Sequence, residues 1–272
     1  MPELPEVETI ANGVDRRVRG DSIVSAWFSH YKEPFRTPPA EMAQGLAGLR
    51  ISRVRRVGKH IVMDLTAGRR KAVTKQLVVH LGMTGRLLIV APEIPVPPHT
   101  HAMLRLVSGR ELRFVDPRRF GRLELLEEAG FKGPGLEPLT ISLNDFVGLF
   151  RGRKLAIKAA LLNQTLLHGV GNIYADESLF RAKIRPTRVA GRLSRERLSR
   201  LHKGLRTVLL AAIRAGGSSV SDYVDADGEA GFFQIQHKVY GREGLPCRVC
   251  GTLIRRIVVA GRGTHFCPNC QT

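Results

Sequence analysis

The sequence contains no uninterrupted apolar run long enough to cross a lipid bilayer as a helix. Its first residues also lack the charged segment and apolar segment that together mark a secretory signal. These absences argue against a membrane-spanning or secreted protein, so we expect a cytoplasmic one. The 272 residues are enough for two domains with separate cores, and they contain no internal repeat.

Cysteine is almost absent, and the few cysteines that occur stand together. Only the last 26 residues contain any, and the four are spaced Cys247-x2-Cys250-x16-Cys267-x2-Cys270. In a cytoplasmic protein this spacing predicts one zinc ion held by four thiolates rather than two disulfides. A closed site with four sulfur ligands is structural, so we assign the zinc no part in the chemistry.

Acidic side chains are also scarce. The chain has 43 lysines and arginines against 24 aspartates and glutamates, a formal net charge of +19 and a pI near 10.8. The excess is concentrated between residues 151 and 214, which contain 15 basic and 3 acidic groups. A merely basic or ribosome-associated protein is the simpler explanation. The clustering, however, predicts a nucleic-acid surface whose binding weakens as salt increases.

The first half of the sequence predicts a helix followed by short strands. Apolar side chains at helical spacing predict a helix over 3–19, with Gly20 as its end. Short β-type runs separated by turn residues follow it and predict a sandwich or barrel. The proline-rich segment 91–98 is expected to be a surface loop. We expect strands at 22–28, 60–65, 72–80, 86–90, 101–107, 111–115 and 122–126.

The second half of the sequence predicts helices. Glycines and prolines at 130–140 mark the best domain boundary. The segment 218–232 is rich in Ser, Asp and Gly and is expected to be a mobile loop before the zinc module. The fold class is therefore α+β with more than one domain. We expect helices at 142–150, 155–163, 172–180 and 194–213, the first and last capped by Ser142 and Ser194.

Pro2 is the first candidate for a catalytic residue. If Met1 is removed, the ring nitrogen of Pro2 becomes a secondary amine that can attack a sugar carbon and form an iminium. An α-amino group titrates at ~8, so much of it is neutral near physiological pH. Glu3 and Glu6 stand beside it with side chains that can carry protons. The simpler explanation is a helix start, since proline and acidic residues are favoured in a first helical turn.

Three further segments suit an enzyme that extrudes a base from DNA. The segment 80–85 (HLGMTG) places Met83 between glycines, and 116–121 (DPRRFG) places Arg118 and Phe120 on a tight turn. Such apolar side chains can fill the void in the base stack, and an arginine can hydrogen-bond the abandoned partner base. In 169–177 (GVGNIYADE), glycines precede a helix whose N-terminus can bind a phosphate. Each segment alone is also compatible with an ordinary turn.

The N-terminus, these three segments and the four-cysteine module occur in the order found in formamidopyrimidine-DNA glycosylases, and the sequence resembles that family over nearly its whole length. The resemblance implies an N-terminal catalytic β-sandwich domain with flanking helices (1–130). It implies a helix–two-turn–helix DNA-binding domain (131–235) with a lesion-capping loop (217–233), and then a zinc-finger hairpin (236–272). The protein would be a monomeric bacterial enzyme, active at the nucleoid, with one structural zinc ion.

The resemblance also implies an activity and roles for single residues. The enzyme would remove 8-oxoguanine and formamidopyrimidines from damaged double-stranded DNA. Pro2 would attack C1′ of the damaged nucleotide, Glu3 would act as acid and base, and β- and δ-elimination would cut the strand. Lys59, which also fits a plain basic turn, would act near the lesion phosphate, and Arg262 would grip backbone phosphates. The expected further DNA contacts are Met83, His99, Arg118, Phe120, Lys158 and Asn172.

Two alternatives remain open. Endonuclease VIII, the sister family, uses the same chemistry on oxidised pyrimidines, but Leu4-Pro5 after Glu3 and the pair Met83 and Phe120 fit the purine branch better. A non-catalytic DNA-binding protein with the same fold would not need Pro2-Glu3, which is intact here. His60, where tyrosine is commoner, and His237 depart from the family pattern without altering the residues above.

Overall fold

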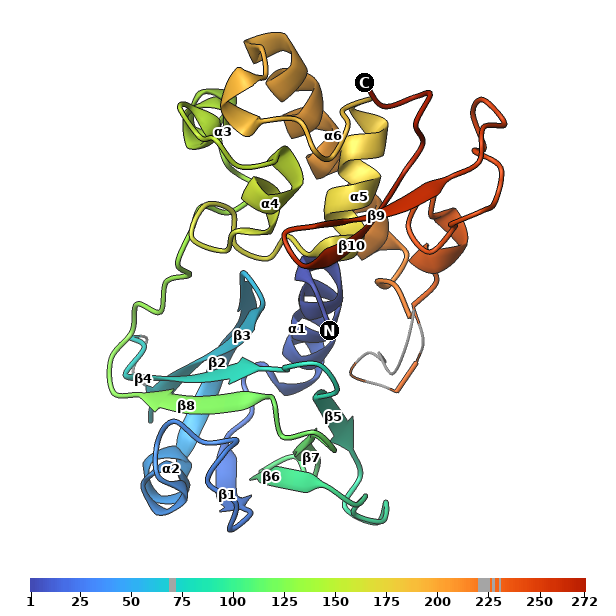
Figure 1. Cartoon of the computed structure of the whole chain (residues 1–272). Coiled ribbons are helices and arrows are strands. Elements are labelled where there is room, and N and C mark those ends of the chain that lie inside the picture. The colour runs from blue at the N-terminus through green and yellow to red at the C-terminus, as the bar shows by residue number, and fades with distance from the viewer. Residues whose placement is uncertain (69–71, 220–225, 227, 230) are drawn as a thin grey trace. The chain divides into compact units, whose positions relative to one another are not determined.

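The computed structural model describes residues 1–68, 72–219, 226, 228–229 and 231–272. They form two compact units, whose elements are labelled in Figure 1. The first unit comprises Met1–Lys132 with Gly216–Phe232, and the second comprises Gly133–Ala215 with Phe233–Thr272. Of the expected lesion-capping loop, residues 220–225, 227 and 230 lie outside the described residues.

The first unit is built on two four-stranded antiparallel sheets, which confirms the expected sandwich. Apolar side chains from both sheets share one buried core, so the two sheets cover each other's inner faces. The first sheet has the order β1 (Ile23–Phe28), β6 (Thr100–Leu106), β7 (Glu111–Val115) and β5 (Arg86–Val90). The second has the order β2 (Leu49–Val57), β3 (His60–Ala67), β4 (Lys75–His80) and β8 (Arg122–Leu126).

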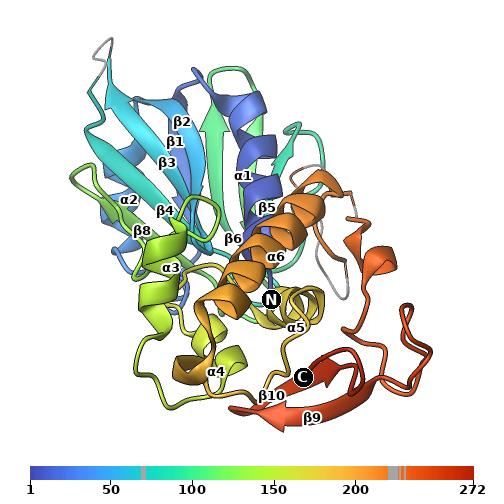
Figure 2. The ribbon, with the colours of Figure 1, turned by 90° about the horizontal axis from the view of Figure 1, so that it is seen from above.

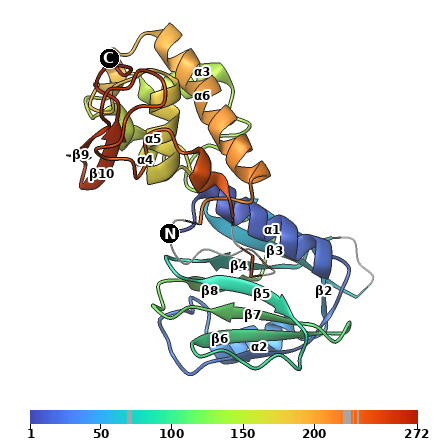
Figure 3. The same ribbon diagram turned by 90° about the vertical axis from the view of Figure 1, so that its right-hand side faces the viewer.

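Two helices flank this sandwich. The helix α1 (Leu4–Val18) packs on β2, β3 and β5, and Figure 3 shows it lying along β2 and β3. Its apolar face is buried as the spacing predicts, and Gly20 ends it with φ +86°. The carboxylate of Asp15 accepts the N–H of Val54 in β2 at 2.6 Å, which fixes the helix against the sheet. The second helix, α2 (Pro39–Leu46), packs on β1 and β8.

The second unit is helical and ends in a hairpin. Ser142 and Ser194 cap α3 (Leu143–Phe150) and α6 (Arg195–Arg214) as expected, because their hydroxyls accept backbone N–H groups of the first helical turn. Figure 2 shows the long α6 beside α3 and α5. No helix in the described ranges has both the length and the apolar character to span a membrane. The other elements are α4 (Ile157–Leu162), α5 (Asn172–Arg181), the 3-10 turns η1 (Ala190–Arg192) and η2 (Phe233–Gln236), β9 (Arg255–Val259) and β10 (Arg262–Phe266).

Candidate functional site

The backbone around Pro2 is fixed by a buried carboxylate. Pro2 and Glu3 are both buried and directly precede α1. The side chain of Glu6, only 2 % exposed, accepts the N–H of Glu3 at 2.9 Å. Its other oxygen accepts the N–H of Ser218 at 2.8 Å. Glu6 therefore holds the peptide next to Pro2 and joins it to the chain that enters the segment 217–233.

Lys59 lies on a tight turn that is tied to the same helix. Gly58, with φ +61°, and Lys59 form the two-residue connection between β2 and β3. The Arg56 guanidinium forms an ion pair with Glu8 of α1, with 2.6 Å between Nε and Oε2. It also donates to the carbonyl of Gly58 at 3.3 Å. The Lys59 turn is thus held to the helix that begins beside Pro2.

The segments 80–85 and 116–121 pack directly against each other. A Cβ atom at Gly82 would lie 2.5 Å from the backbone nitrogen of Gly121, so only glycine permits this contact. Met83 and Phe120 remain 42 % and 49 % exposed on the two turns. The Arg118 guanidinium lies 4.6 Å from the centre of the Phe120 ring. The structure thus presents two large apolar side chains and a cation to solvent on adjoining turns.

A residue that the sequence did not single out, Asp116, joins these turns. It is fully buried, and one carboxylate oxygen accepts the hydroxyl of Thr84 at 2.5 Å. The other oxygen accepts the N–H of Gly121 at 2.7 Å. His99 is exposed with φ +63°, and its carbonyl accepts the N–H of Asp116 at 3.0 Å. His99 therefore lies next to the turn that presents Phe120.

A hollow of about 600 Å³ adjoins the Phe120 turn, and Arg36, His60, His80 and Arg122 contribute to its lining. Burial and neighbouring positive groups lower the pKa of His80 to about 4, so its ring is neutral at physiological pH. Its Nδ1 accepts the N–H of Gly82 at 3.2 Å, which leaves the proton on Nε2. The hollow is therefore lined by two arginines, two histidines and the carboxylate of Glu124, together with apolar side chains.

In the second unit, Gln164 shapes the connection between α4 and α5. Its amide nitrogen donates to the carbonyls of Leu162 and Val170, each at 2.8 Å, and its oxygen accepts the N–H of Gly169 at 2.9 Å. Gly171 then takes the N-cap position of α5 and offers no side chain to cap the helix. The side-chain amide of Gln164 thus stabilises the two turns that lead into α5. The N-terminus of that helix favours a bound anion.

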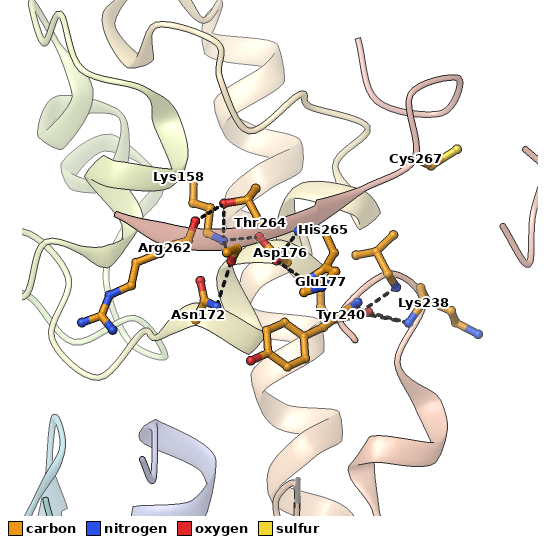
Figure 4. A network of polar contacts seen from close by, with 12 residues as sticks. Lys158, Asn172, Asp176, Glu177, Lys238, Tyr240, Arg262, Thr264, His265 and Cys267 are labelled. Carbon is orange, nitrogen blue, oxygen red and sulfur yellow. Dashed lines mark hydrogen bonds and ion pairs between the residues drawn. The ribbon is translucent and has the colours of Figure 1, made fainter. Parts of the chain in front are cut away.

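The side chain of Lys158, which we expected to contact DNA, is completely buried. Its ammonium forms an ion pair with Asp176, with 2.7 Å between Nζ and Oδ1. It also donates to the carbonyl of Gly263 at 2.9 Å, and Asn172 donates to the same carbonyl at 3.0 Å (Figure 4). Lys158 therefore cannot contact a DNA phosphate in this arrangement. It holds the β9–β10 hairpin at the residue after Arg262.

The helix α5 anchors the rest of the hairpin module through two buried carboxylates. The second oxygen of Asp176 accepts the N–H of His265 at 2.8 Å. Glu177 accepts backbone N–H groups of Lys238 and Tyr240, although burial raises its pKa (Figure 4). Arg262, in contrast, is exposed at the start of β10. The hairpin that carries Arg262 is thus anchored to α5 by the buried carboxylate of Asp176.

The four cysteines form a site for one structural zinc ion. Their sulfur atoms all lie within 4.8 Å of one another. A tetrahedral ion with Zn–S bonds of about 2.3 Å requires sulfurs about 3.8 Å apart. The pairs Cys250–Cys267 and Cys247–Cys270 are separated by 3.5 and 4.0 Å. Four thiolates this close together repel one another, so the deprotonated set requires a cation.

The first unit is a sandwich whose first helix follows a buried Pro-Glu pair. The second is a helix–two-turn–helix unit with a four-cysteine hairpin. Together in one chain, these features define a class of DNA glycosylases. Three family models match the chain. They describe the formamidopyrimidine-DNA glycosylase N-terminal domain over residues 1–123 and its H2TH domain over 135–224. The third, over 244–272, describes the zinc finger found in FPG and IleRS. The chain belongs to the formamidopyrimidine-DNA glycosylase family.

Individual relatives agree over their full length. The formamidopyrimidine-DNA glycosylase of Solibacter usitatus is 46% identical over 273 residues, which cover 100% of this chain and 99% of the relative. The MutM (Fpg) crystal structure from Thermus thermophilus has a TM-score of 0.86 at 42% identity and covers 99% of this chain and 98% of its own. A Lactococcus lactis enzyme in complex with DNA containing an abasic site has a TM-score of 0.88 at 33% identity, with 99% of both chains covered.

Proposed function

We propose that this protein is a base-excision repair enzyme that removes oxidised purines from duplex DNA and then cuts the abasic strand. Family membership supports a DNA glycosylase with lyase activity, and damaged double-stranded DNA is its partner. Lactococcus lactis relatives have been crystallised with Fapy-dG DNA and with abasic DNA. The observation that carries the assignment to this chain is the buried Glu6 carboxylate, which fixes the peptide following Pro2.

The reaction begins once Met1 has been removed and Pro2 carries a free secondary amine. The nitrogen of Pro2 attacks C1′, the bond from C1′ to the base breaks, and the base leaves with that electron pair and takes up a proton. Glu3 gives a proton to the sugar ring oxygen, and the opened sugar stays bound to Pro2 as an iminium.

The iminium then drives strand cleavage. Because it acidifies the proton on C2′, loss of that proton expels the 3′ phosphate by β-elimination. A second proton loss expels the 5′ phosphate by δ-elimination, and water releases the sugar fragment from Pro2. Lys59, held to α1 through Arg56, is positioned to neutralise phosphate charge near the lesion.

The remaining residues hold and read the DNA. Met83 and Phe120 fill the gap left by the extruded nucleotide, and Arg118 hydrogen-bonds the unpaired base opposite. Asn172, Arg262 and His99 contact the backbone. The functional divisions are 1–130 for catalysis, 131–235 for DNA binding with the capping loop 217–233, and 236–272 for the zinc finger. The enzyme acts as a cytoplasmic monomer.

Borohydride trapping on a duplex containing 8-oxoguanine opposite cytosine tests the mechanism. Reduction of the iminium would leave a covalent protein–DNA adduct, and sequencing of the modified N-terminal peptide by fragmentation would identify Pro2 as the attached residue. A protein with one additional residue before Pro2 has no secondary amine at its end and is expected to give no adduct. Glu3→Gln is the matched control, because it keeps the amine and should still trap a preformed abasic site. Equal trapping by the extended protein would refute attack by Pro2.

Comparison of two lesions tests the substrate class. The purine assignment predicts release of 8-oxoguanine and formamidopyrimidine from duplex DNA, with slower release of thymine glycol. Efficient release of only the oxidised pyrimidine would show that the protein has the substrate preference of endonuclease VIII. Binding without release of any base would instead support a non-catalytic protein.

A further inference from the structure

The second unit has a basic surface that none of these roles uses. A hollow of about 430 Å³ is lined by Arg185, Arg188, Arg192 and Arg197 together with uncharged residues. A second hollow, of about 410 Å³, shares Arg192 with the first and continues to Arg153 and Lys154. No acidic residue contributes to either lining within the described part of the chain. We name the six basic residues the arginine track.

Among the described residues, no ion pair joins an aspartate or glutamate to the four arginines of the first hollow. Arg197 donates at 3.4 Å to an oxygen of Thr272, the last residue, which carries the terminal carboxylate. The Arg185 guanidinium lies 5.4 Å from the centre of the Phe266 ring. The neighbouring Arg200 is different, because it pairs with Glu196 at 2.8 Å. Four arginines beside one terminal carboxylate leave an excess of positive charge, and a bound polyanion would neutralise that excess.

The first hollow of the arginine track lies near the C-terminal end of α5. Thr272 accepts the N–H of Arg185 and donates to the carbonyl of Lys183, so the chain end marked C in Figure 1 locates the first hollow. Lys183 follows the C-terminal end of α5, whereas Asn172 begins that helix. Ten helical residues span about 15 Å. The chain end beside the first hollow therefore lies near the end of α5 opposite Asn172.

We propose that the arginine track binds the phosphodiester backbone of a second duplex, separate from the one held for excision. Guanidinium groups match phosphate oxygens in a bidentate fork, and two adjoining hollows that share Arg192 fit a chain of phosphates better than one small anion. The N-terminus of the 20-residue α6 directly follows Leu193, which lines the first hollow, and adds the positive end of a helix dipole. A protein with both sites can pass between DNA segments without complete release.

The test measures bridging of two undamaged duplexes, one with a donor dye and the other with an acceptor dye, by the full-length zinc-loaded protein. The variant is Arg188→Glu with Arg192→Glu, both of which are exposed. The matched control is Lys203→Glu with Arg206→Glu, which changes the charge equally at exposed positions of α6 outside the track. Sedimentation shows whether each protein is monomeric, and thermal melting shows that each is folded.

The wild type is expected to give energy transfer at low salt. The affinity of the control for the second duplex should remain within about two-fold of the wild-type affinity. The track variant should bind the second duplex about ten-fold more weakly, with the slope of log K against log salt reduced by about 1.8 for two lost phosphates. Excision from a short lesion duplex should be unchanged in both, so a failure of the proposed catalytic function would be recognised separately. Absence of transfer in the wild type would overturn the proposal. Equal losses of affinity for the second duplex in the track variant and the control would also overturn it. So would stronger competition for the second site from anionic phospholipid vesicles than from DNA at equal phosphate concentration.

Discussion

Replacing Lys158 with methionine would leave a charged carboxylate in the interior of the second unit. Lys158 and Asp176 both have fully buried side chains, and their charged atoms are 2.7 Å apart. Methionine fills much of the volume of the lysine chain but supplies no positive charge and no donor for the carbonyl of Gly263. Breaking a buried ion pair by removing one partner costs about 3–5 kcal/mol, because the other charge stays without compensation. We expect a loss of unfolding free energy of this size.

The Lys158→Met substitution should lower the unfolding free energy of the helical second unit only. Far-UV circular dichroism during urea unfolding follows the helices, which lie mostly in the second unit. The single tryptophan, Trp27, lies in β1, so its fluorescence reports on the first unit and should be unchanged. DNA affinity should decrease with the stability, because Lys158 and Asn172 hold the carbonyl of Gly263, the residue that follows Arg262.

A second substitution separates support of the hairpin from direct phosphate contact. Asp176→Asn in the Lys158→Met background removes the uncompensated charge and keeps an oxygen for the N–H of His265. We expect the double variant to recover about half of the lost stability, a coupling of about 2 kcal/mol, together with most of the DNA affinity. If Lys158 contacted a phosphate, the double variant would lack that contact and its salt slope would remain about 0.9 lower. That result, with an unaltered stability in the single variant, would refute the supporting role.

Three further outcomes follow from the same contacts. Cys250→Ser, or removal of zinc by a chelator, should abolish DNA binding while Trp27 fluorescence shows an intact first unit; full affinity without zinc would contradict this. Asp116→Ala removes the acceptor of Thr84 and Gly121, so we expect about ten-fold slower lesion excision, with Asp116→Asn intermediate. Burial lowers the pKa of His237 to about 4, so the folded unit binds this proton less readily than the unfolded chain does. As the pH falls from about 6.5 to about 5, the wild type should therefore lose about 2 kcal/mol of unfolding free energy relative to His237→Leu. Urea unfolding of both proteins measures this loss. A difference that does not change with pH would contradict it.

Local sequence pattern predicts most elements of the fold and fails where the pattern is interrupted. The strands β5, β7 and β8 begin and end where turn residues and β-type runs place them. The strand β2 was not predicted, because a shift in register between Ile51 and Arg53 interrupts the alternation. Ile51 and Val54 are both buried although they are three residues apart. The helix α2 was also missed, since it begins at a proline and contains Gly45, whose Cβ would lie 2.7 Å from Leu125.

For the site, the sequence predicts the residues on exposed turns better than the residues that hold those turns. Met83 and Phe120 stand out in short motifs, but their common support, Asp116, bonds to Thr84 across 32 positions of the chain. Gln164 likewise shapes the entry to α5 through contacts that depend on the folded connection. Such long-range hydrogen bonds leave no periodic signal in one sequence, so the structure is needed to identify them.

Lys158 shows why net charge alone misleads about DNA contacts. The stretch 151–214 contains 15 basic residues, and its excess of charge predicts one phosphate-binding surface. The structure divides these residues, because Lys158 is paired with Asp176 inside the unit, whereas the arginines of the track line two hollows that contain no acidic residue among those the structure describes. An exposed arginine that has no partner costs little alone, but a cluster of them repels and is stabilised by a bound polyanion. The charge that the excision site does not use is therefore itself an argument for a second segment of DNA.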